Sequence, residues 1–181
     1  MLDRDTLRSV AATLGTDEEL VGSIERFEAL LALDGDVLDR HHFDPGHVTA
    51  SSFVVHPYRP AVALVFHRKL QAWLQPGGHV EPDDISHQSA ARREVAEETG
   101  LTDLEALGII DLDIHPFPAR DHQPAHLHFD LRWAFRAVSE ELTIGDGVSG
   151  VRWVPFAEAM TMKPSVARPV RRLAGSLDYR P

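Results

Sequence analysis

Residues 77–101 read GGHVEPDDISHQSAARREVAEETGL, and this stretch decides the fold. It predicts a loop followed by a helix, because its two leading glycines form a turn directly after a strand-like segment. Ser86 is a suitable N-cap for that helix, and Gly100 is a suitable residue to end it. We therefore expect a helix over residues 86–99 that follows a Gly-Gly turn at the end of a strand.

Three carboxylates gather on one face of the expected helix. Glu97 and Glu98 follow Glu94 by three and four residues, so the three side chains start within about 5–6 Å of one another. Like charges at this spacing repel by roughly 0.2–0.5 kcal/mol per pair. Taken alone, the pattern fits either a solvated acidic face, on which Arg93 and Glu97 pair, or a site where a hard cation such as Mg²⁺ takes carboxylate oxygens.

The stretch as a whole resembles the Nudix box, G-x5-E-x7-R-E-U-x-E-E-x-G-U, in which U is a bulky aliphatic residue. Gly78 matches the first glycine. The second half of the motif is matched throughout, by Arg93, Glu94, Val95, Glu97, Glu98, Gly100 and Leu101. Asp84 stands where the first glutamate is expected, and the segment from Asp84 to Arg93 is one residue longer than the motif. A one-residue insertion in the loop before the helix accounts for both departures.

This resemblance implies the Nudix fold, an α+β domain in which a mixed sheet lies between helices as an α/β/α sandwich. It also implies a catalytic group. Glu94, Glu97 and Glu98 would bind Mg²⁺ or Mn²⁺ together with the carbonyl oxygen of Gly78, and Arg93 would orient a glutamate of the site. Metal ions bound there would bridge phosphate oxygens, neutralise developing charge and lower the pKa of bound water.

The implied function is that of a metal-dependent pyrophosphohydrolase. Such an enzyme cuts a phosphoanhydride bond in a small nucleoside-diphosphate-linked or related organic pyrophosphate. Two other functions use the same fold. A catalytically weak Nudix domain would be a nucleotide-binding sensor, but such domains usually lose the acids that are complete here at Glu94, Glu97 and Glu98. An isopentenyl diphosphate isomerase-like enzyme is disfavoured, because that family's proton transfer uses a cysteine and the chain has none.

The motif does not fix the general base. Glu94 is one choice, since its position in the family serves as ligand or base. Many members instead use an acid in a later loop before a tryptophan, and here that region runs from Asp146 to Trp153. Gly150 occupies the place where a glutamate is often found. Asp146 can substitute and meet the substrate if its loop folds inward, and otherwise it belongs to a surface turn.

A second group of polar residues lies on one expected strand. His126, His128 and Asp130 alternate with apolar residues and so share one face of that strand. Two neighbours in this array could bind iron or zinc, but the three positions span about 13 Å and cannot all meet one ion. The favoured interpretation is a polar sheet face that lines the substrate cleft, with simple exposure as the alternative. His79, beside the glycines, is a further candidate for substrate contact or for a structural hydrogen bond.

Composition limits the classes of partner. The 181 residues, 43% of them hydrophobic and 25% charged, suffice for one packed domain with a short extension. The net charge of −10 and the lack of a basic stripe argue against long nucleic acids, so we expect a small phosphorylated substrate. No apolar run is long enough to span a membrane, and the N-terminus does not resemble a secretory signal. We therefore expect a cytoplasmic enzyme.

The chain divides into an N-terminal helical extension, residues 1–45, and a Nudix domain, residues 46–181. Apolar residues from Asp5 to Leu14 have helical spacing, and a second helix is expected to start at Thr16. These helices either pack on the domain or pair with a second subunit, which makes a homodimer an expectation. The other expected elements are strands at Thr49–His56, Ala61–His67, Leu70–Leu74, Ala106–Ile114, His126–Ala137 and Val151–Val154, then helical segments near Phe156–Met160 and Ser165–Ala174.

Overall fold

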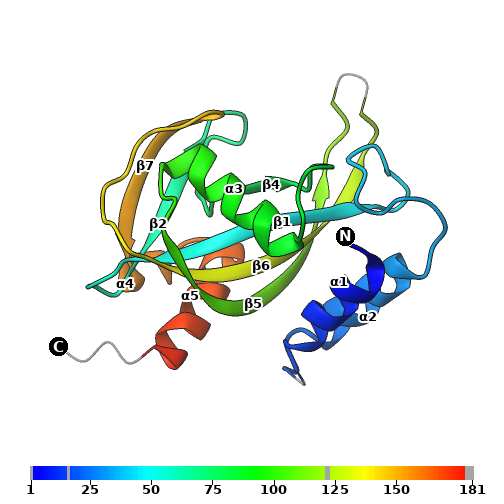
Figure 1. Ribbon diagram of the computed structural model, residues 1–181, viewed down its shortest axis with the longest axis horizontal. Coiled ribbons are helices and arrows are strands. Elements are labelled where there is room, and N and C mark those ends of the chain that lie inside the picture. Colours follow the sequence, from blue (N-terminus) through cyan, green and yellow to red (C-terminus); the bar gives the residue numbers. More distant parts are fainter. Residues whose placement is uncertain (1, 16, 121–122, 178–181) are drawn as a thin grey trace.

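The computed structural model describes residues 2–15, 17–120 and 123–177. This part of the chain forms one seven-stranded sheet with helices packed against it (Figure 1). The elements are, in chain order, α1 (Arg4–Ala12), α2 (Val21–Leu31), β1 (Gly46–Val55), β2 (Ala61–His67), β3 (Ala72–Leu74), β4 (Gly77–His79), α3 (His87–Thr99), β5 (Leu104–Phe117), β6 (His126–Ala137), β7 (Val148–Pro155), α4 (Phe156–Ala159) and α5 (Pro164–Ser176).

The sheet is built around β1. Its strand order is β3-β2-β1-β6-β5, with β4 also paired to β1 and β7 to β2. β1 and β6 run parallel, whereas the other pairs are antiparallel. The mixed sheet confirms the expected α+β class. Because Gly78 pairs with Ala50 of β1, the Gly-Gly segment is a short strand held in the sheet, and not only a turn.

The expected elements are present with shifted ends. β7 begins at Val148, earlier than expected, and β5 extends to Phe117 because it pairs with β6 along its whole length. The short strand expected from Leu70 begins at Ala72, since the preceding residue, Gln71, has a positive φ of 50° that is typical of a turn. The helix expected from Thr16 begins at Val21, and Thr16 itself lies outside the described residues.

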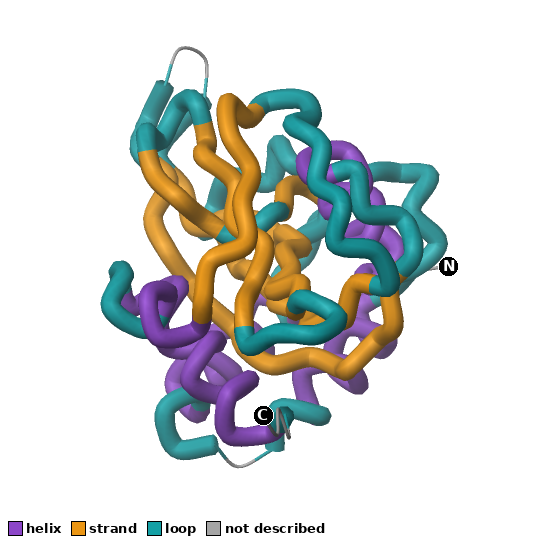
Figure 2. The backbone as a smooth tube through the Cα atoms, turned by 90° about the vertical axis from the view of Figure 1, so that its left-hand side faces the viewer, coloured by secondary structure: helices purple, strands orange, loops and turns teal. Residues whose placement is uncertain are grey.

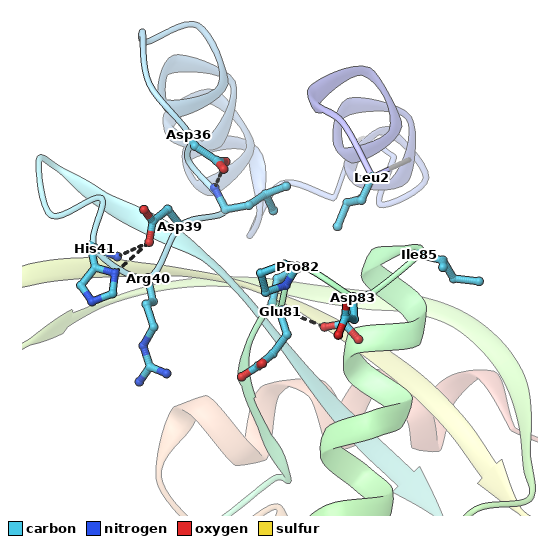
Figure 3. A pocket seen from close by; sticks show the side chains of 12 residues that line it. Leu2, Asp36, Asp39, Arg40, His41, Glu81, Pro82, Asp83 and Ile85 are labelled. Atoms are coloured by element: carbon cyan, nitrogen blue, oxygen red, sulfur yellow. Dashed lines mark hydrogen bonds and ion pairs between the residues drawn. The ribbon is translucent and has the colours of Figure 1, made fainter.

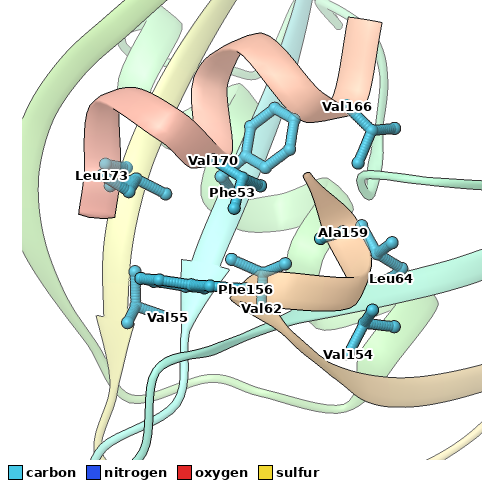
Figure 4. Close-up of a cluster of buried hydrophobic side chains, with 11 residues drawn as sticks. Phe53, Val55, Val62, Leu64, Val154, Phe156, Ala159, Val166, Val170 and Leu173 are labelled. Atoms are coloured by element: carbon cyan, nitrogen blue, oxygen red, sulfur yellow. The ribbon is translucent and has the colours of Figure 1, made fainter. Parts of the chain in front are cut away.

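Alternate residues of β1 face different helices, as expected for a strand buried on both faces. Ala50 belongs to a buried cluster with Ala90 and Ala91 of α3. Phe53 belongs to the opposite cluster, which packs β1 and β2 against α4 and α5 (Figure 4). Viewed at right angles, helices lie on both sides of the strands (Figure 2). This layering holds α3 against β1 and so fixes the helix that carries the acids.

The N-terminal helices pack on the sheet of their own chain. Leu7 of α1 and Phe27 of α2 are buried in one cluster with Val48 and Phe129 of the sheet. The rings of Phe27 and Phe129 have centroids 6.5 Å apart. The apolar stripes of α1 and α2 are therefore used within the chain, which is one of the two arrangements that the sequence allows.

Candidate active site

The helix α3 starts and ends where the sequence predicts. The Ser86 hydroxyl accepts a hydrogen bond from the Ser89 backbone N–H, and the Ser89 side chain accepts one from the Ser86 N–H, which forms a capping box. Gly100 ends the helix in the left-handed conformation, with φ of 77°, which a residue with a Cβ adopts only at a cost. The caps at both ends fix which helix face meets β4.

That face brings two of the three glutamates against the backbone of β4. The Gly77 N–H donates to a Glu98 carboxylate oxygen at 3.1 Å, and Glu98 is 8% exposed. A Cβ at Gly78 would lie 2.5 Å from Oε1 of Glu94, so the lack of a side chain at Gly78 lets the Glu94 carboxylate approach the β4 backbone. Glu97 is the outermost of the three, with half of its side chain exposed. The structure therefore gathers the predicted acids and Gly78 in one place.

Burial in the protein disfavours the charged form of two of these carboxylates, Glu98 and Glu94. It raises the pKa of Glu98 to about 8, against the effect of the Gly77 hydrogen bond and with that of the charges of Glu94 and Glu97. Burial also raises the pKa of Glu94, although the Arg93 guanidinium opposes it. Carboxylate oxygens are the ligands that Mg²⁺ and Mn²⁺ prefer. A cluster of partly buried, under-compensated carboxylates is thus chemically suited to such an ion.

Arg93 organises the site from within the protein. Its guanidinium donates to both oxygens of Asp84, at 3.2 and 3.0 Å, and to the backbone oxygen of His79 at 2.8 Å. It also contacts Glu94 at 2.9 Å and Glu97 at 3.2 Å. Asp84 therefore faces Arg93 despite the extra residue in the loop, and the insertion is absorbed before α3 begins. Arg93 uses its donors to hold the loop and two acids, as expected for a positioning residue.

The model of one family, the NUDIX domain, matches residues 47–173. The chain belongs to the Nudix family. The matched residues include the glycine turn, the acidic helix α3 and the strands of the sheet. They begin after α1 and α2. As a family member with the full set of acids, the chain is a Nudix-type pyrophosphohydrolase, an enzyme acting on acid anhydrides.

Solved structures share the Nudix fold. An Ap4A hydrolase from C. elegans, in a binary complex, is 15% identical over 71% of this chain and 95% of its own, with a TM-score of 0.57. The NUDIX domain of Shewanella oneidensis NrtR with ADP ribose is 20% identical over 81% and 97%, with a TM-score of 0.52. E. coli dihydroneopterin triphosphate pyrophosphohydrolase is 14% identical over 72% and 96%, with a TM-score of 0.54. A search of curated proteins finds no match in sequence.

The loop before β7 folds onto the C-terminal end of the Nudix helix. The Asp146 N–H donates to the Glu97 carbonyl oxygen and the Gly145 N–H to that of Glu98, both at 3.2 Å. A Cβ at Gly145 would lie 1.7 Å from the Glu97 carbonyl oxygen, so glycine is required for this approach. The backbone of this loop therefore packs on the end of α3, while the Asp146 side chain is exposed. Gly150 lies under the Trp73 ring.

The predicted histidines come together with one that the sequence analysis missed. His126 and His128 of β6 lie beside His47, because β1 and β6 are parallel with His47 opposite His128. The ring centroid of His47 lies 5.0 Å from that of His126, 4.9 Å from that of His128 and 5.1 Å from that of His79. Burial lowers the pKa of His47 to about 4, of His79 to about 3 and of His128 to about 2. These three rings are neutral at neutral pH.

Asp130 does not join the histidines. Its carboxylate accepts hydrogen bonds from the Ser51 hydroxyl at 2.7 Å and from Arg132 Nε at 2.8 Å. Arg132 in turn contacts Asp111 at 3.2 Å and Asp113 at 2.9 Å, and it is 1% exposed. This part of the polar sheet face is a buried ion-pair network, so the substrate-cleft interpretation does not hold at Asp130 and Arg132.

A cavity of about 740 Å³ opens beside residues 80–85, the loop of the Nudix box before α3. It lies between residues 36–41, which follow α2, and residues 80–85, which precede α3 (Figure 3). Asp84, the partner of Arg93, lines it, and so does Arg40, which lies on the side of Asp39 and His41 in Figure 3. The segment after α2 thus forms one wall of a cavity whose other wall is the catalytic motif.

Proposed function

We propose that the chain hydrolyses a phosphoanhydride bond in a small nucleoside-diphosphate-linked or related organic pyrophosphate, in a reaction that requires Mg²⁺ or Mn²⁺. One observation carries this proposal. Glu94 and Glu98 are largely buried against β4, and this burial raises their pKa values although Arg93 contacts Glu94 and the Gly77 N–H donates to Glu98. Divalent ions bound there would bring positive charge to these carboxylates. The same ions would neutralise the charge of a pyrophosphate substrate.

Each residue of the motif has a distinct task in this reaction. Glu94, Glu97 and Glu98 would hold the metal ions, with the Gly78 carbonyl oxygen as a further ligand. When bound, the ions supply charge neutralisation and lower the pKa of a bound water. Arg93 keeps Glu94 and Glu97 at fixed positions through its contacts at 2.9 and 3.2 Å. Hydrolysis then places the oxygen of water on one phosphorus, and the other phosphate leaves.

Asp146 is the better of the two candidates for the general base. Glu94 is tied to Arg93 at 2.9 Å and lies against Gly78, so its carboxylate is committed to the ligand position. The Asp146 backbone is bonded to the Glu97 carbonyl oxygen, while its side chain is exposed at the end of the acidic helix. A carboxylate there can reach a water molecule that attacks from the solvent side.

The segment between α2 and β1 is the proposed specificity wall. Arg40 lines the same cavity as Asp84 and is suited to a substrate phosphate. His79 follows Gly78 directly, and His126 and His128 lie further along the same region; we assign them to the substrate side of the site. The Ap4A hydrolase and the ADP ribose complex share the fold, which supports nucleoside-linked pyrophosphates as the first compounds to test.

The first experiment is a phosphate-release screen with the matched pair Glu98→Gln and Glu105→Gln. The screen covers sugar nucleotides, dinucleoside polyphosphates, dNTPs and ADP-ribose, with and without Mg²⁺ or Mn²⁺. We expect metal-dependent turnover of one class, a loss of about 10²-fold or more in kcat for Glu98→Gln, and wild-type activity for Glu105→Gln, whose side chain is 62% exposed beside Arg136. Nucleotide binding without turnover would instead indicate a sensor, and wild-type activity of Glu98→Gln would contradict the site.

The second experiment tests the base. Asp146→Asn should lower kcat by about 10²- to 10⁴-fold, the usual contribution of a general base, while Asp103→Asn, an exposed acid in the turn after α3, should leave kcat unchanged. The acidic limb of the pH–rate profile, on which protonation inactivates a general base, is the further readout. If Asp146→Asn retains the wild-type rate and profile, Glu94 becomes the base.

Some expectations about the whole molecule stay predictions. They are the division into residues 1–45 and 46–181, the homodimer and the cytoplasmic location. Among the described residues no helix is long and apolar enough to cross a membrane. Sedimentation of the purified chain measures its oligomeric state directly.

A further inference from the structure

Three histidines converge at the end of the sheet where β1 and β6 begin. One side-chain nitrogen from each of His47, His126 and His128 lies within 4.8 Å of the other two. The Nε2 atoms of His126 and His128 are 3.2 Å apart. Two imidazole nitrogens bound to one tetrahedral Zn²⁺ lie about 3.4 Å apart, given Zn–N bonds of about 2.0–2.1 Å. The observed separation is therefore close to that of two ligands of one ion.

Hydrogen bonds on the outer side of two rings direct their free nitrogens inward. The His47 Nδ1 lies 3.2 Å from the His42 carbonyl oxygen, and the His126 Nδ1 lies 2.8 Å from that of Pro124. A carbonyl oxygen can only accept, so both Nδ1 atoms carry the proton and both Nε2 atoms hold a lone pair. A backbone carbonyl on the far nitrogen is also what orients a histidine that binds a metal.

The His47 ring is the strongest sign that something belongs between these side chains. His47 is fully buried, with 0% exposure, and its Nε2 has no hydrogen-bond partner among the described residues. Buried polar atoms are nearly always partnered. An inward-pointing lone pair beside two further imidazoles is suited to a cation and not to an apolar neighbour.

We propose that His47, His126 and His128 form a binding site for one Zn²⁺-like ion, separate from the carboxylate site on α3. Imidazole nitrogens favour Zn²⁺, Cu²⁺, Ni²⁺ and Fe²⁺, whereas the carboxylates of α3 favour Mg²⁺ and Mn²⁺, so the two sites select different metals. Three protein ligands leave a fourth coordination position open for water or a substrate oxygen.

The surroundings of the site support it. The Phe43 ring lies 5.0 Å from His126, and the Phe117 ring stacks on His128 at 4.9 Å, so two aromatic side chains pack against the histidines. The His79 ring lies 5.1 Å from that of His47. Since His79 follows Gly78, the histidine site borders the strand on which Glu94 and Glu98 rest.

The test is metal binding by the full chain without a histidine tag. Protein stripped with a chelator is titrated with Zn²⁺ against a chromophoric chelator, and with Co²⁺ while its visible absorption is recorded. We expect one equivalent of Zn²⁺ per chain and the intense visible bands of tetrahedral Co²⁺. His126→Gln and His47→Gln should each weaken Zn²⁺ binding by at least about 100-fold, because loss of a ligand exceeds the 10- to 100-fold effect of losing its supporting partner.

Two control variants separate this site from other sources of Zn²⁺ binding. Glu98→Gln should keep the wild-type affinity for Zn²⁺, and so should His41→Gln, whose ring is exposed. Circular dichroism shows which variants fold, and His126→Gln, at a side chain that is 6% exposed where His47 is 0% exposed, tests the site even if His47→Gln does not fold. The proposal is overturned if the wild type binds no Zn²⁺, if the histidine variants bind it as tightly as the wild type, or if Glu98→Gln abolishes the binding.

Discussion

Two clusters in this protein each contain three carboxylates, but they differ in how much positive charge surrounds those carboxylates. The cluster on the Nudix helix contains Glu94, Glu97 and Glu98, and Arg93 is the cation that contacts it. The cluster on β5 and β6 contains acids that contact three arginines. Its members are Asp111, Asp113 and Asp130, with Arg132, Arg168 and Arg172. The second cluster is complete within the chain, whereas the first needs added charge.

The pKa values record this difference. At Asp113 burial favours the protonated form, but the hydrogen bond with His115 and the charges of Arg132 and Arg168 outweigh it and hold the pKa well below its usual range. At Glu98 burial prevails and raises the pKa to about 8. Strongly shifted groups occur both at functional sites and in structural ion-pair networks. Their direction differs here: the acids of α3 lack enough nearby positive charge, whereas the ion pairs of the compensated cluster hold β5, β6 and α5 together.

The largest effect on stability should come from removing Arg132 from the cluster on β5 and β6. Arg132→Met leaves three acids without their central cation, and Arg132 is only 1% exposed. Removal of one partner from a buried ion pair costs about 3–5 kcal/mol, and chemical denaturation measures this loss. The exposed pair Arg152–Glu158 provides the control: Arg152→Met should cost at most about 1 kcal/mol. Equal losses in the two variants would show that the network is not structural.

A smaller effect on stability should follow when a metal ion binds the cluster of Glu94, Glu97 and Glu98. If Mg²⁺ binds the folded chain, stability rises with its concentration, by about 2.7 kcal/mol at 100 times the dissociation constant. Glu98→Gln should lose most of this gain. Without metal the variant should be at least as stable as the wild type, because the amide removes a buried charge and its oxygen still accepts from the Gly77 N–H. Thermal unfolding with and without EDTA measures both quantities, and a metal-free variant that is markedly less stable would contradict this account.

The sequence predicted much of the fold and of the acidic site because both depend on local patterns. Strand alternation identified β6, the Ser86 and Gly100 caps fixed α3, and helical spacing placed the glutamates on one face. The ion pair of Asp84 with Arg93 was not predicted, and it forms because the loop absorbs the extra residue. The short strand β4 was not expected, since three residues beginning with two glycines carry no strand pattern.

The histidine cluster and the arginine network were out of reach for a physical reason. His47 meets His128 through the parallel pairing of two strands that are far apart in the chain, and no spacing in the sequence encodes that pairing. The same holds for Arg168, which reaches Asp111 from α5. The alternation along β6 placed Asp130 beside the histidines, but it could not show that Arg132 bonds to that carboxylate. Contacts between distant elements therefore decide what each polar residue does.

The smallest effect is on how the unfolding free energy depends on pH, through Asp113 of the cluster on β5 and β6. The pKa of Asp113 is lower in the folded chain than in the unfolded chain, so the unfolded chain takes up the proton first as the pH falls below about 4. The stability that this carboxylate contributes is fully present above that pH and is lost below it, with a slope of at most about 1.4 kcal/mol per pH unit for one group. The variant Asp113→Asn lacks this slope.

The difference in unfolding free energy between wild type and Asp113→Asn should stay constant above about pH 5 and narrow steadily on acidification. Denaturation curves at a series of pH values provide the measurement. If the difference persists unchanged into acid, the Asp113 carboxylate gains nothing from His115, Arg132 and Arg168, and the contrast between the two clusters fails.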